Sequence, residues 1–217
     1  MLTAELSLSG RAGRQKIRGR VVAGFAPPSS MRLEGVAPFG PPAFILAARG
    51  DMAVLLLPRD SRVLRGARPE EVLGALTGVA LGPADLQAIL TGCVVSAPRA
   101  TTGRLHANGW ASIDLMAGAT LYLEPGGRVS PGLPRWQLRA ARRSGWHIEY
   151  PMWIGVFPQS VRLESEDAAL MVDLTASLSQ VETTVDLDEK AFTVDLPTDA
   201  EPITLDQLRQ NGPLGDR

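Results

Sequence analysis

The sequence predicts a mainly β protein in which about eleven antiparallel strands form a strongly curved sheet, with a few helices. Three observations lead to this fold class. Most apolar residues alternate with polar ones, as in strands that have one solvated face. Short runs of turn residues separate these segments, which favours an antiparallel meander. A helical period replaces the alternation only over residues 69–91. We expect so long a meander to curl strongly or to close on itself.

The N-terminal region predicts two long strands. Residues 3–10 alternate cleanly, and residues 14–25 place Lys16, Arg18 and Arg20 on one face and apolar residues on the other. This is the pattern of a strand with one solvated side. The APPSS segment that follows predicts a turn or a protruding loop, because proline cannot donate a hydrogen bond to a strand ladder.

Residues 31–58 predict three further strands, separated by APFGPP and ARGD. The first strand alternates, whereas AFILAA and MAVLLL are apolar on both faces. One face of these strands can pack into an ordinary core. The other apolar face also needs a cover, and we expect one of the two faces to line the concave side of a curled sheet.

Residues 69–91 predict two short amphipathic helices. Pro69 and Pro83 suit the first position of a helix, and Gly78 and Gly92 are typical stops. Each helix carries an apolar stripe that must lie on another surface. We expect the pair to form a lid over the concave face of the sheet.

The second half of the chain returns to strands. Asn108-Gly109 predicts a hairpin, and RRSG predicts a turn between two alternating strands at residues 136–150. PMWIGVFPQS is expected to form an apolar loop, and Thr204 to cap a short terminal helix. The whole chain, residues 1–217, is expected to form one domain.

Periodicity alone is compatible with a packed interior and with a hollow one. The 11 aromatic residues are few for a chain of this length, so aliphatic residues must fill or line the interior. We expect the following residues to line a ligand cavity: Leu33, Phe44, Leu46, Val54, Leu56, Val72, Leu73, Leu76, Leu86, Ile89, Leu90, Ile113, Leu121, Leu123, Trp136, Trp146 and Ile148.

Motifs of catalysis and of metal or phosphate binding are missing from the sequence. The chain has only His106 and His147, and Cys93 is its one cysteine, so we expect no metal, no cofactor and no disulfide. It has no Gly-x-Ser-x-Gly, Gly-x-Gly-x-x-Gly or Walker motif. We therefore predict no catalytic residues. A cluster of Asp114, His106 or Glu149 at the mouth of the cavity would instead favour the hypothesis of an enzyme that acts on an amphiphile.

Charge is distributed unevenly along the chain. Residues 1–160 carry eight more basic than acidic residues, and residues 161–217 carry nine more acidic than basic ones. We expect the two parts to neutralise each other in the fold. No pattern of aromatic and basic residues indicates nucleic-acid binding. The N-terminus does not have the pattern of a signal peptide, and the longest apolar runs are too short to span a bilayer.

The order of these segments resembles the LolA/LolB superfamily of periplasmic lipoprotein carriers, and is most similar to LolB-like outer-membrane lipoproteins. The resemblance begins with SLSGRAGRQKIRGRVVAGFAPPSSMRLEGVAPFGPPAFIL. Two helices that each end in LTG follow where the family inserts its lid. FPQSVRLES and AFTVDLPTDAEPITLDQL resemble the closing strands of the family, so the resemblance covers almost the whole chain.

The resemblance implies an incomplete antiparallel barrel with a helical lid, whose cavity holds lipoprotein acyl chains or another amphiphile without catalysis. It implies a monomer in the periplasm, anchored to the outer membrane by an N-terminal lipid that this sequence lacks. It also implies that Arg32 holds the lid, and that Phe25 or Met31, beside a protruding loop, contacts the inner leaflet of the outer membrane. The alternative function is an assembly factor of the outer membrane with a filled cavity and a protein partner.

Overall fold

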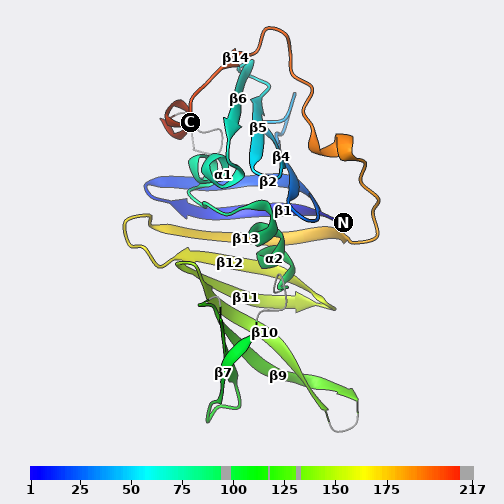
Figure 1. Ribbon diagram of the computed structural model, residues 1–217, viewed down its shortest axis with the longest axis vertical. Helices are drawn as coiled ribbons and strands as arrows, with labels where there is room; N and C mark the ends of the chain where they lie inside the picture. The colour runs from blue at the N-terminus through cyan, green and yellow to red at the C-terminus, as the bar shows by residue number, and fades with distance from the viewer. Residues whose placement is uncertain (94–98, 117, 131–132, 211–217) are drawn as a thin grey trace.

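A single open sheet of 14 strands organises the molecule (Figure 1). The computed structural model describes residues 1–93, 99–116, 118–130 and 133–210. The first strands are β1 (Leu2–Ala12), β2 (Gln15–Ala26), β3 (Ser30–Val36), β4 (Ile45–Arg49), β5 (Met52–Leu57) and β6 (Arg62–Ala67). The later strands are β7 (Ala100–Leu105), β8 (Ala111–Leu115), β9 (Thr120–Ser130), β10 (Leu133–Arg143), β11 (Trp146–Ile154), β12 (Phe157–Ser165), β13 (Val172–Glu182) and β14 (Glu201–Pro202). The helices are α1 (Pro69–Thr77), α2 (Pro83–Thr91), α3 (Leu205–Gln210) and the 3₁₀ helix η1 (Glu189–Phe192).

Neighbouring strands follow the order β14-β6-β5-β4-β3-β2-β1-β13-β12-β11-β10-β9-β8-β7. All pairs are antiparallel except β14 with β6, which is parallel. The chain thus runs outward from β1 to β6, crosses the sheet with α1 and α2, and returns as a second meander from β7 to β13. The pairing of β13 with β1 joins the two meanders at the centre.

The mainly β class and the two inserted helices are confirmed, but the sheet is neither closed nor strongly curled. In Figure 1, β5 and β6 stand upright whereas β1, β2 and β13 lie across the view, so the sheet twists along its length. Strong curling was expected from the length of the meander, and it would have brought the apolar faces to one shared interior. Different parts of the chain cover the two faces instead, so closure is not needed to bury them.

Several local predictions hold and one is wrong. Asn108-Gly109 lies in the turn between β7 and β8. Ser144-Gly145, the second half of RRSG, forms the turn between β10 and β11. The Thr204 hydroxyl accepts a hydrogen bond from the backbone amide of Gln207 at the start of α3. The expected loop PMWIGVFPQS is instead a tight hairpin, in which β11 and β12 pair as far as Ile154 opposite Phe157. Its turn contains Gly155, whose φ of +61° suits glycine.

The C-terminal strap, residues 183–204, covers the second face of β3 and β4, which carries Arg32 and Glu34 on β3 and apolar residues on β4. Its helix η1 lies against these strands, with Phe192 buried, and the Arg32 guanidinium donates hydrogen bonds to the carbonyls of Ala191 (3.1 Å) and Thr193 (2.6 Å). Arg32 points away from the α1 and α2 side, because it alternates with Leu33, which belongs to the core beneath the helices. In Figure 1 the strap passes over the top of the molecule to α3, which packs on α1.

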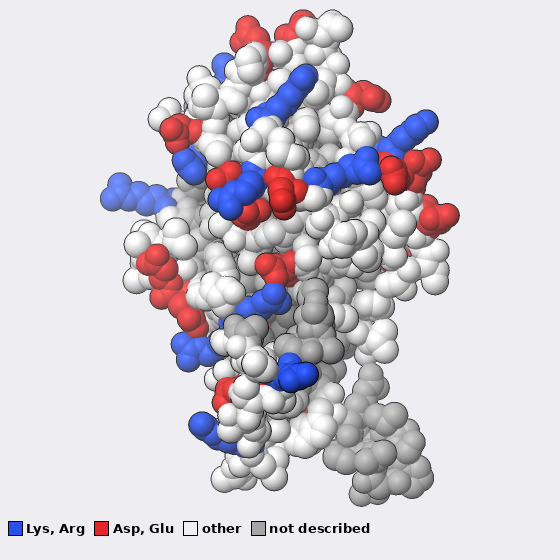
Figure 2. Space-filling view, in the orientation of Figure 1, with Lys and Arg blue, Asp and Glu red and all other residues white. Residues whose placement is uncertain are grey.

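Some ion pairs join the basic part of the sequence to the acidic part, and others lie within the basic part. On the face seen in Figure 2, blue and red side chains lie next to each other at several places. Arg49–Glu189 and Arg142–Glu166 join the basic and acidic parts of the sequence, but Arg139–Glu124 and Arg143–Asp85 lie within the basic part. The expected neutralisation between the parts is therefore only partial.

Candidate functional site: an apolar cavity under two helices

Local sequence signals define both helices that cover the cavity. Pro69 and Pro83 occupy first helical positions, and Gly78 and Gly92 end the helices with φ of +76° and +64°. The Glu71 side chain accepts a hydrogen bond from the Arg68 amide (3.0 Å), and the neighbouring Arg68 guanidinium lowers the pKa of Glu71. The short connection between the helices keeps both on the same face of the sheet.

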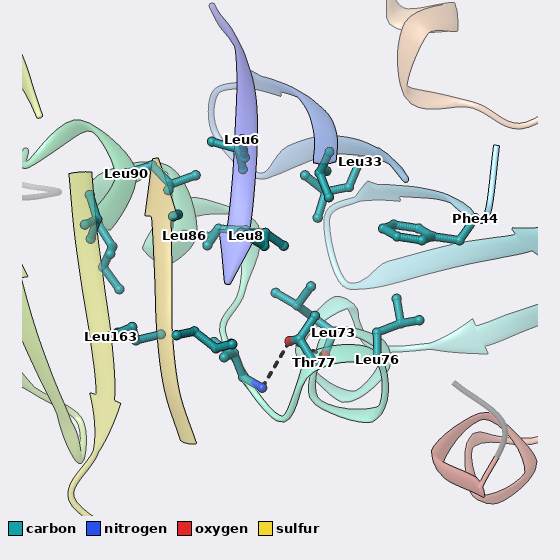
Figure 3. A pocket seen from close by; sticks show the side chains of 16 residues that line it. Leu6, Leu8, Leu33, Phe44, Leu73, Leu76, Thr77, Leu86, Leu90 and Leu163 are labelled. Carbon is teal, nitrogen blue, oxygen red and sulfur yellow. Dashed lines mark hydrogen bonds between the residues drawn. The ribbon is translucent and has the colours of Figure 1, made fainter. Parts of the chain in front are cut away.

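A narrow apolar cavity of about 90 Å³ lies between these helices and the sheet (Figure 3). It is lined by Leu6, Leu8, Val21, Leu33, Phe44, Leu73, Leu76, Thr77, Val79, Leu86, Ile89, Leu90, Val161, Leu163, Leu174 and Ala176. Thr77 has the only polar side chain of this set. Its hydroxyl donates to the Leu73 carbonyl (2.9 Å) and accepts from the Val79 amide (3.1 Å), so it has no need of a ligand.

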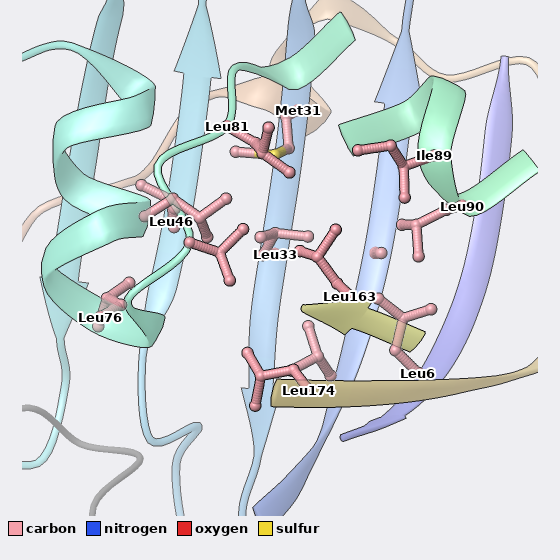
Figure 4. Close-up of a cluster of buried hydrophobic side chains, with 14 of the residues drawn as sticks. Leu6, Met31, Leu33, Leu46, Leu76, Leu81, Ile89, Leu90, Leu163 and Leu174 are labelled. Atoms are coloured by element: carbon pink, nitrogen blue, oxygen red, sulfur yellow. The ribbon is translucent and has the colours of Figure 1, made fainter. Parts of the chain in front are cut away.

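The cavity is continuous with a densely filled core. Figure 4 shows Leu6, Leu33 and Leu163 on the sheet facing Ile89 and Leu90 on α2. Leu46 and Leu174 belong to the sheet side of this core, and Leu76 and Leu81 belong to its helical side. Most of the interior between sheet and helices is therefore packed. The empty space is smaller than the ~300–1,000 Å³ typical of small-molecule sites.

The predicted lining residues divide into four groups. Seven of them line the cavity: Leu33, Phe44, Leu73, Leu76, Leu86, Ile89 and Leu90. Four belong to the surrounding core: Leu46, Val72, Trp146 and Ile148. Three line a separate groove: Leu121, Leu123 and Trp136. The last three lie elsewhere: Val54 and Leu56 on β5, and Ile113 on β8.

Val54 and Leu56 show that alternation does not tell which face of a strand lies under the helices. Val54 and Leu56 flank Leu55, which lies in the core beneath the helices, so they project from the opposite face of β5. Several lining residues on central strands were not predicted, among them Leu6, Leu163 and Leu174. Their alternation was visible, but only the pairing of β1 with β13 brings these strands under α2.

A second groove, of about 280 Å³, borders the C-terminal end of α2. Gly92 forms one wall, and the β9–β11 strands and the hairpin tip at Val156 form the others. The Trp153 indole donates a hydrogen bond to the Leu138 carbonyl (2.9 Å) and packs against Gly92. Trp136 lines this groove, where it is 39% exposed, and does not line the cavity under the helices.

Arg143, rather than Arg32, fastens a helix over the cavity. The Arg143 guanidinium, at the end of β10, donates to the carboxylate of Asp85 in the first turn of α2. Arg32 binds the C-terminal strap on the other face, as described above. The sequence could not distinguish these arginines, because Asp85 and Arg143 are 58 positions apart.

The expected membrane-contact residues are buried. Phe25 and Met31 are both 0% exposed, and Met31 lies beside Leu81 in Figure 4, so neither reaches the surface in this conformation. Phe39, in the loop between β3 and β4, is 88% exposed. Arg59 donates to the carbonyl of Phe39 (2.7 Å) and holds this loop. The proline-rich APFGPP segment was the sequence signal for it.

Residues that could support catalysis do not gather at the cavity. His106 lies beside Ser112 (3.0 Å), Asp114 accepts a hydrogen bond from Thr120 (2.8 Å), and Glu149 pairs with Arg162 (3.3 Å). None of the three lines the cavity. Burial raises the pKa of Tyr150 well above its ordinary value, so it stays neutral. Within the part of the chain that the structure describes, no three metal-ligating side chains cluster.

Within the residues that the structure describes, no helix is both long enough and apolar enough to cross a bilayer.

The fold is similar to the folds of two solved structures. Over 89% of its length the chain superposes on 90% of a LolA superfamily protein from Nitrosomonas europaea, with a TM-score of 0.52 and 11% identity. It also matches a DUF1329 family protein from Desulfovibrio piger, with a TM-score of 0.52, 11% identity, and coverage of 88% and 89% of the two chains. No protein-family model and no curated protein sequence matches this chain.

Proposed function

We propose that this protein binds the acyl chains of lipoproteins or of another amphiphile, without catalysis, beneath α1 and α2. The observation that carries the proposal is the cavity lining, in which one satisfied hydroxyl, that of Thr77, is the only polar side-chain group. Such a surface cannot stabilise a developing charge, but it suits a hydrocarbon chain. Each methylene removed from water gains about 0.8 kcal/mol.

Binding a full acyl chain requires the cover to move, because a cavity of about 90 Å³ holds only a short part of one. Helix α2 is the better candidate for this motion. It is bounded by Gly82 and Gly92, and its Leu86 is only partly buried. Helix α1 is held from outside by α3, whose Leu208 is buried against the core.

We further propose that the protein acts in lipoprotein localisation or envelope biogenesis, in the periplasm and as a monomer, with lipoproteins as partners. The likeness to a LolA superfamily structure supports the fold on which this role rests. Phe39, exposed and held by Arg59, replaces Phe25 and Met31 as the residue proposed to contact the inner leaflet of the outer membrane.

A second candidate function is an assembly factor whose interior stays filled. The packed core around the cavity favours it, as do exposed Met152, Ile154 and Val156 at the hairpin tip beside the second groove. In this case the hairpin tip would contact a protein partner.

The experiment compares Leu86→Trp with the control Leu105→Trp in binding a fluorescent fatty acid. Leu86 lines the cavity, whereas Leu105 on β7 is exposed. We expect wild type and L105W to bind the probe, and L86W to bind it at least tenfold more weakly while melting at a similar temperature. Failure of the wild type to bind the fatty acid, or equal binding by L86W, would overturn the carrier proposal and favour the filled interior.

A further inference from the structure

The β1–β2 hairpin carries a group of cations without carboxylate partners. The basic face, defined as Arg11, Arg14, Lys16, Arg18 and Arg20, is fully exposed. Among the described residues, none of its five side chains takes part in an ion pair. Eight other arginines do form ion pairs: Arg32, Arg49, Arg68, Arg139, Arg142, Arg143, Arg162 and Arg209. Five cations that form no ion pair are thus adjacent on one hairpin, whereas the other described cations without an ion pair, among them Arg62, Arg99 and Arg104, lie elsewhere in the fold.

Strand register places these cations on the sheet face opposite the cavity. Arg18 and Arg20 alternate with Ile17 and Val21, which are buried in the core under the helices. Lys16 lies directly opposite Arg11 on β1. Like charges in directly opposed positions destabilise a sheet. The arrangement therefore opposes folding and calls for a partner that neutralises it.

The residues opposite these cations on neighbouring strands are one carboxylate, Asp173 opposite Arg11, and several hydroxyl groups. Arg18 lies opposite Ser9 and Arg20 opposite Ser7, and Ser7 in turn lies opposite Ser177 on β13. Three carboxylates on this face pair with arginines outside the basic face, since Asp173 and Glu164 pair with Arg162, and Glu34 pairs with Arg32. Glu5 lies one pair beyond Arg20, opposite Val22.

The C-terminal strap covers only the other end of these strands. Its Leu187 lies near Gly24 on β2, and η1 lies on β3 and β4. In Figure 1 the strap runs along the right of the view, whereas the β1–β2 turn projects at the left. The basic face is thus uncovered within the described chain. Exposed Val22 (42%) and Val36 (39%) border it, and Val36 lies opposite Arg20.

We propose that the basic face binds the surface of a membrane that contains anionic phospholipids. Cations and hydroxyls on one sheet face can contact many phosphate groups of a planar surface at once. Exposed valines beside the cations suit the lipid interface and would gain nothing on a nucleic-acid backbone. The proposal does not depend on the cavity or on its ligand.

The experiment measures co-sedimentation with vesicles of phosphatidylcholine alone or mixed with phosphatidylglycerol. The variant is K16E/R18E/R20E. Its matched control is R62E/R99E/R104E, which makes the same charge change at exposed arginines outside the basic face. We expect the wild type and the control to bind the mixed vesicles, and the variant to bind at least about tenfold more weakly. Added salt should abolish this binding, because the charges are exposed.

Three results would overturn the proposal: equal binding to neutral vesicles, an equal loss in the control, or tighter binding to a short DNA duplex than to the mixed vesicles. Circular dichroism melts check that each variant is folded. If K16E/R18E/R20E does not fold, K16Q/R18Q/R20Q takes its place. L86W should bind the vesicles like the wild type, which separates this proposal from the one about the cavity.

Discussion

The Arg143 guanidinium on β10 donates a hydrogen bond to Asp85 in the first turn of α2, and so joins a helix over the cavity to the sheet. It is the only ion pair between α1 or α2 and the sheet among the residues that the structure describes. Asp85 also lies where the helix dipole favours negative charge. The pair thus fixes the N-terminal end of α2, whereas Gly92 ends the helix beside Trp153.

We expect Arg143→Ala to speed the uptake of a fluorescent fatty acid severalfold, since α2 would then leave the sheet more easily. The pair is partly exposed, so its loss should cost only about 0–1 kcal/mol of unfolding free energy. Stopped-flow fluorescence measures the rate, and thermal melting measures the stability. Arg142→Ala is the control, because Arg142 pairs with Glu166 away from α2. Equal uptake rates in both variants would mean that α2 is not the moving element.

Arg32→Ala should loosen the C-terminal strap. The guanidinium bonds to two backbone carbonyls, and losing hydrogen bonds from a charged donor costs about 1.5–3 kcal/mol. Hydrogen exchange at residues 186–204 should rise, while exchange in β11 and β12 should not change. Arg49→Ala removes only the exposed pair with Glu189 and should have a much smaller effect. An unchanged exchange rate in the strap would show that Phe192 alone holds it.

Gly92→Ala should destabilise the end of α2. The residue has φ of +64°, and a Cβ there would lie 2.5 Å from the Trp153 ring. Together these effects should cost about 1–3 kcal/mol, measured by urea unfolding. Gly103→Ala is the control, because a Cβ at that position on β7 meets nothing within 4 Å. A similar stability for the two variants would contradict the close packing of α2 on Trp153.

The Arg162–Asp173 pair should make stability depend on pH in the acid range. A bidentate contact (2.9 Å for each bond) lowers the pKa of Asp173 below its ordinary value of 3.8. A lowered pKa in the folded state stabilises the fold fully above the ordinary value, and this stabilisation disappears as pH falls through the lowered value. Asp173→Asn should therefore lower the melting temperature at pH 7 and have little effect near pH 2. An equal change in melting temperature at both pH values would show that the charge of Asp173 does not contribute to stability.

Short-range features of the fold could be predicted because their causes are local. Pro69, Gly78, Pro83 and Gly92 define two helices through backbone preferences that act within one turn. Asn108-Gly109 defines a hairpin for the same reason. Alternation assigned most strands, and it showed that AFILAA and MAVLLL need a cover on both faces.

Contacts between distant parts of the chain were decided only by the tertiary structure. Strand β13 pairs with β1, which brings Leu6, Leu163 and Leu174 under α2. The strap covers the second face of β3 and β4, so Arg32 binds the strap while Arg143 binds α2. Alternation separates the two faces of a strand but does not say what covers each of them. That choice depends on which distant segments bury the most apolar surface together, and no local preference encodes it.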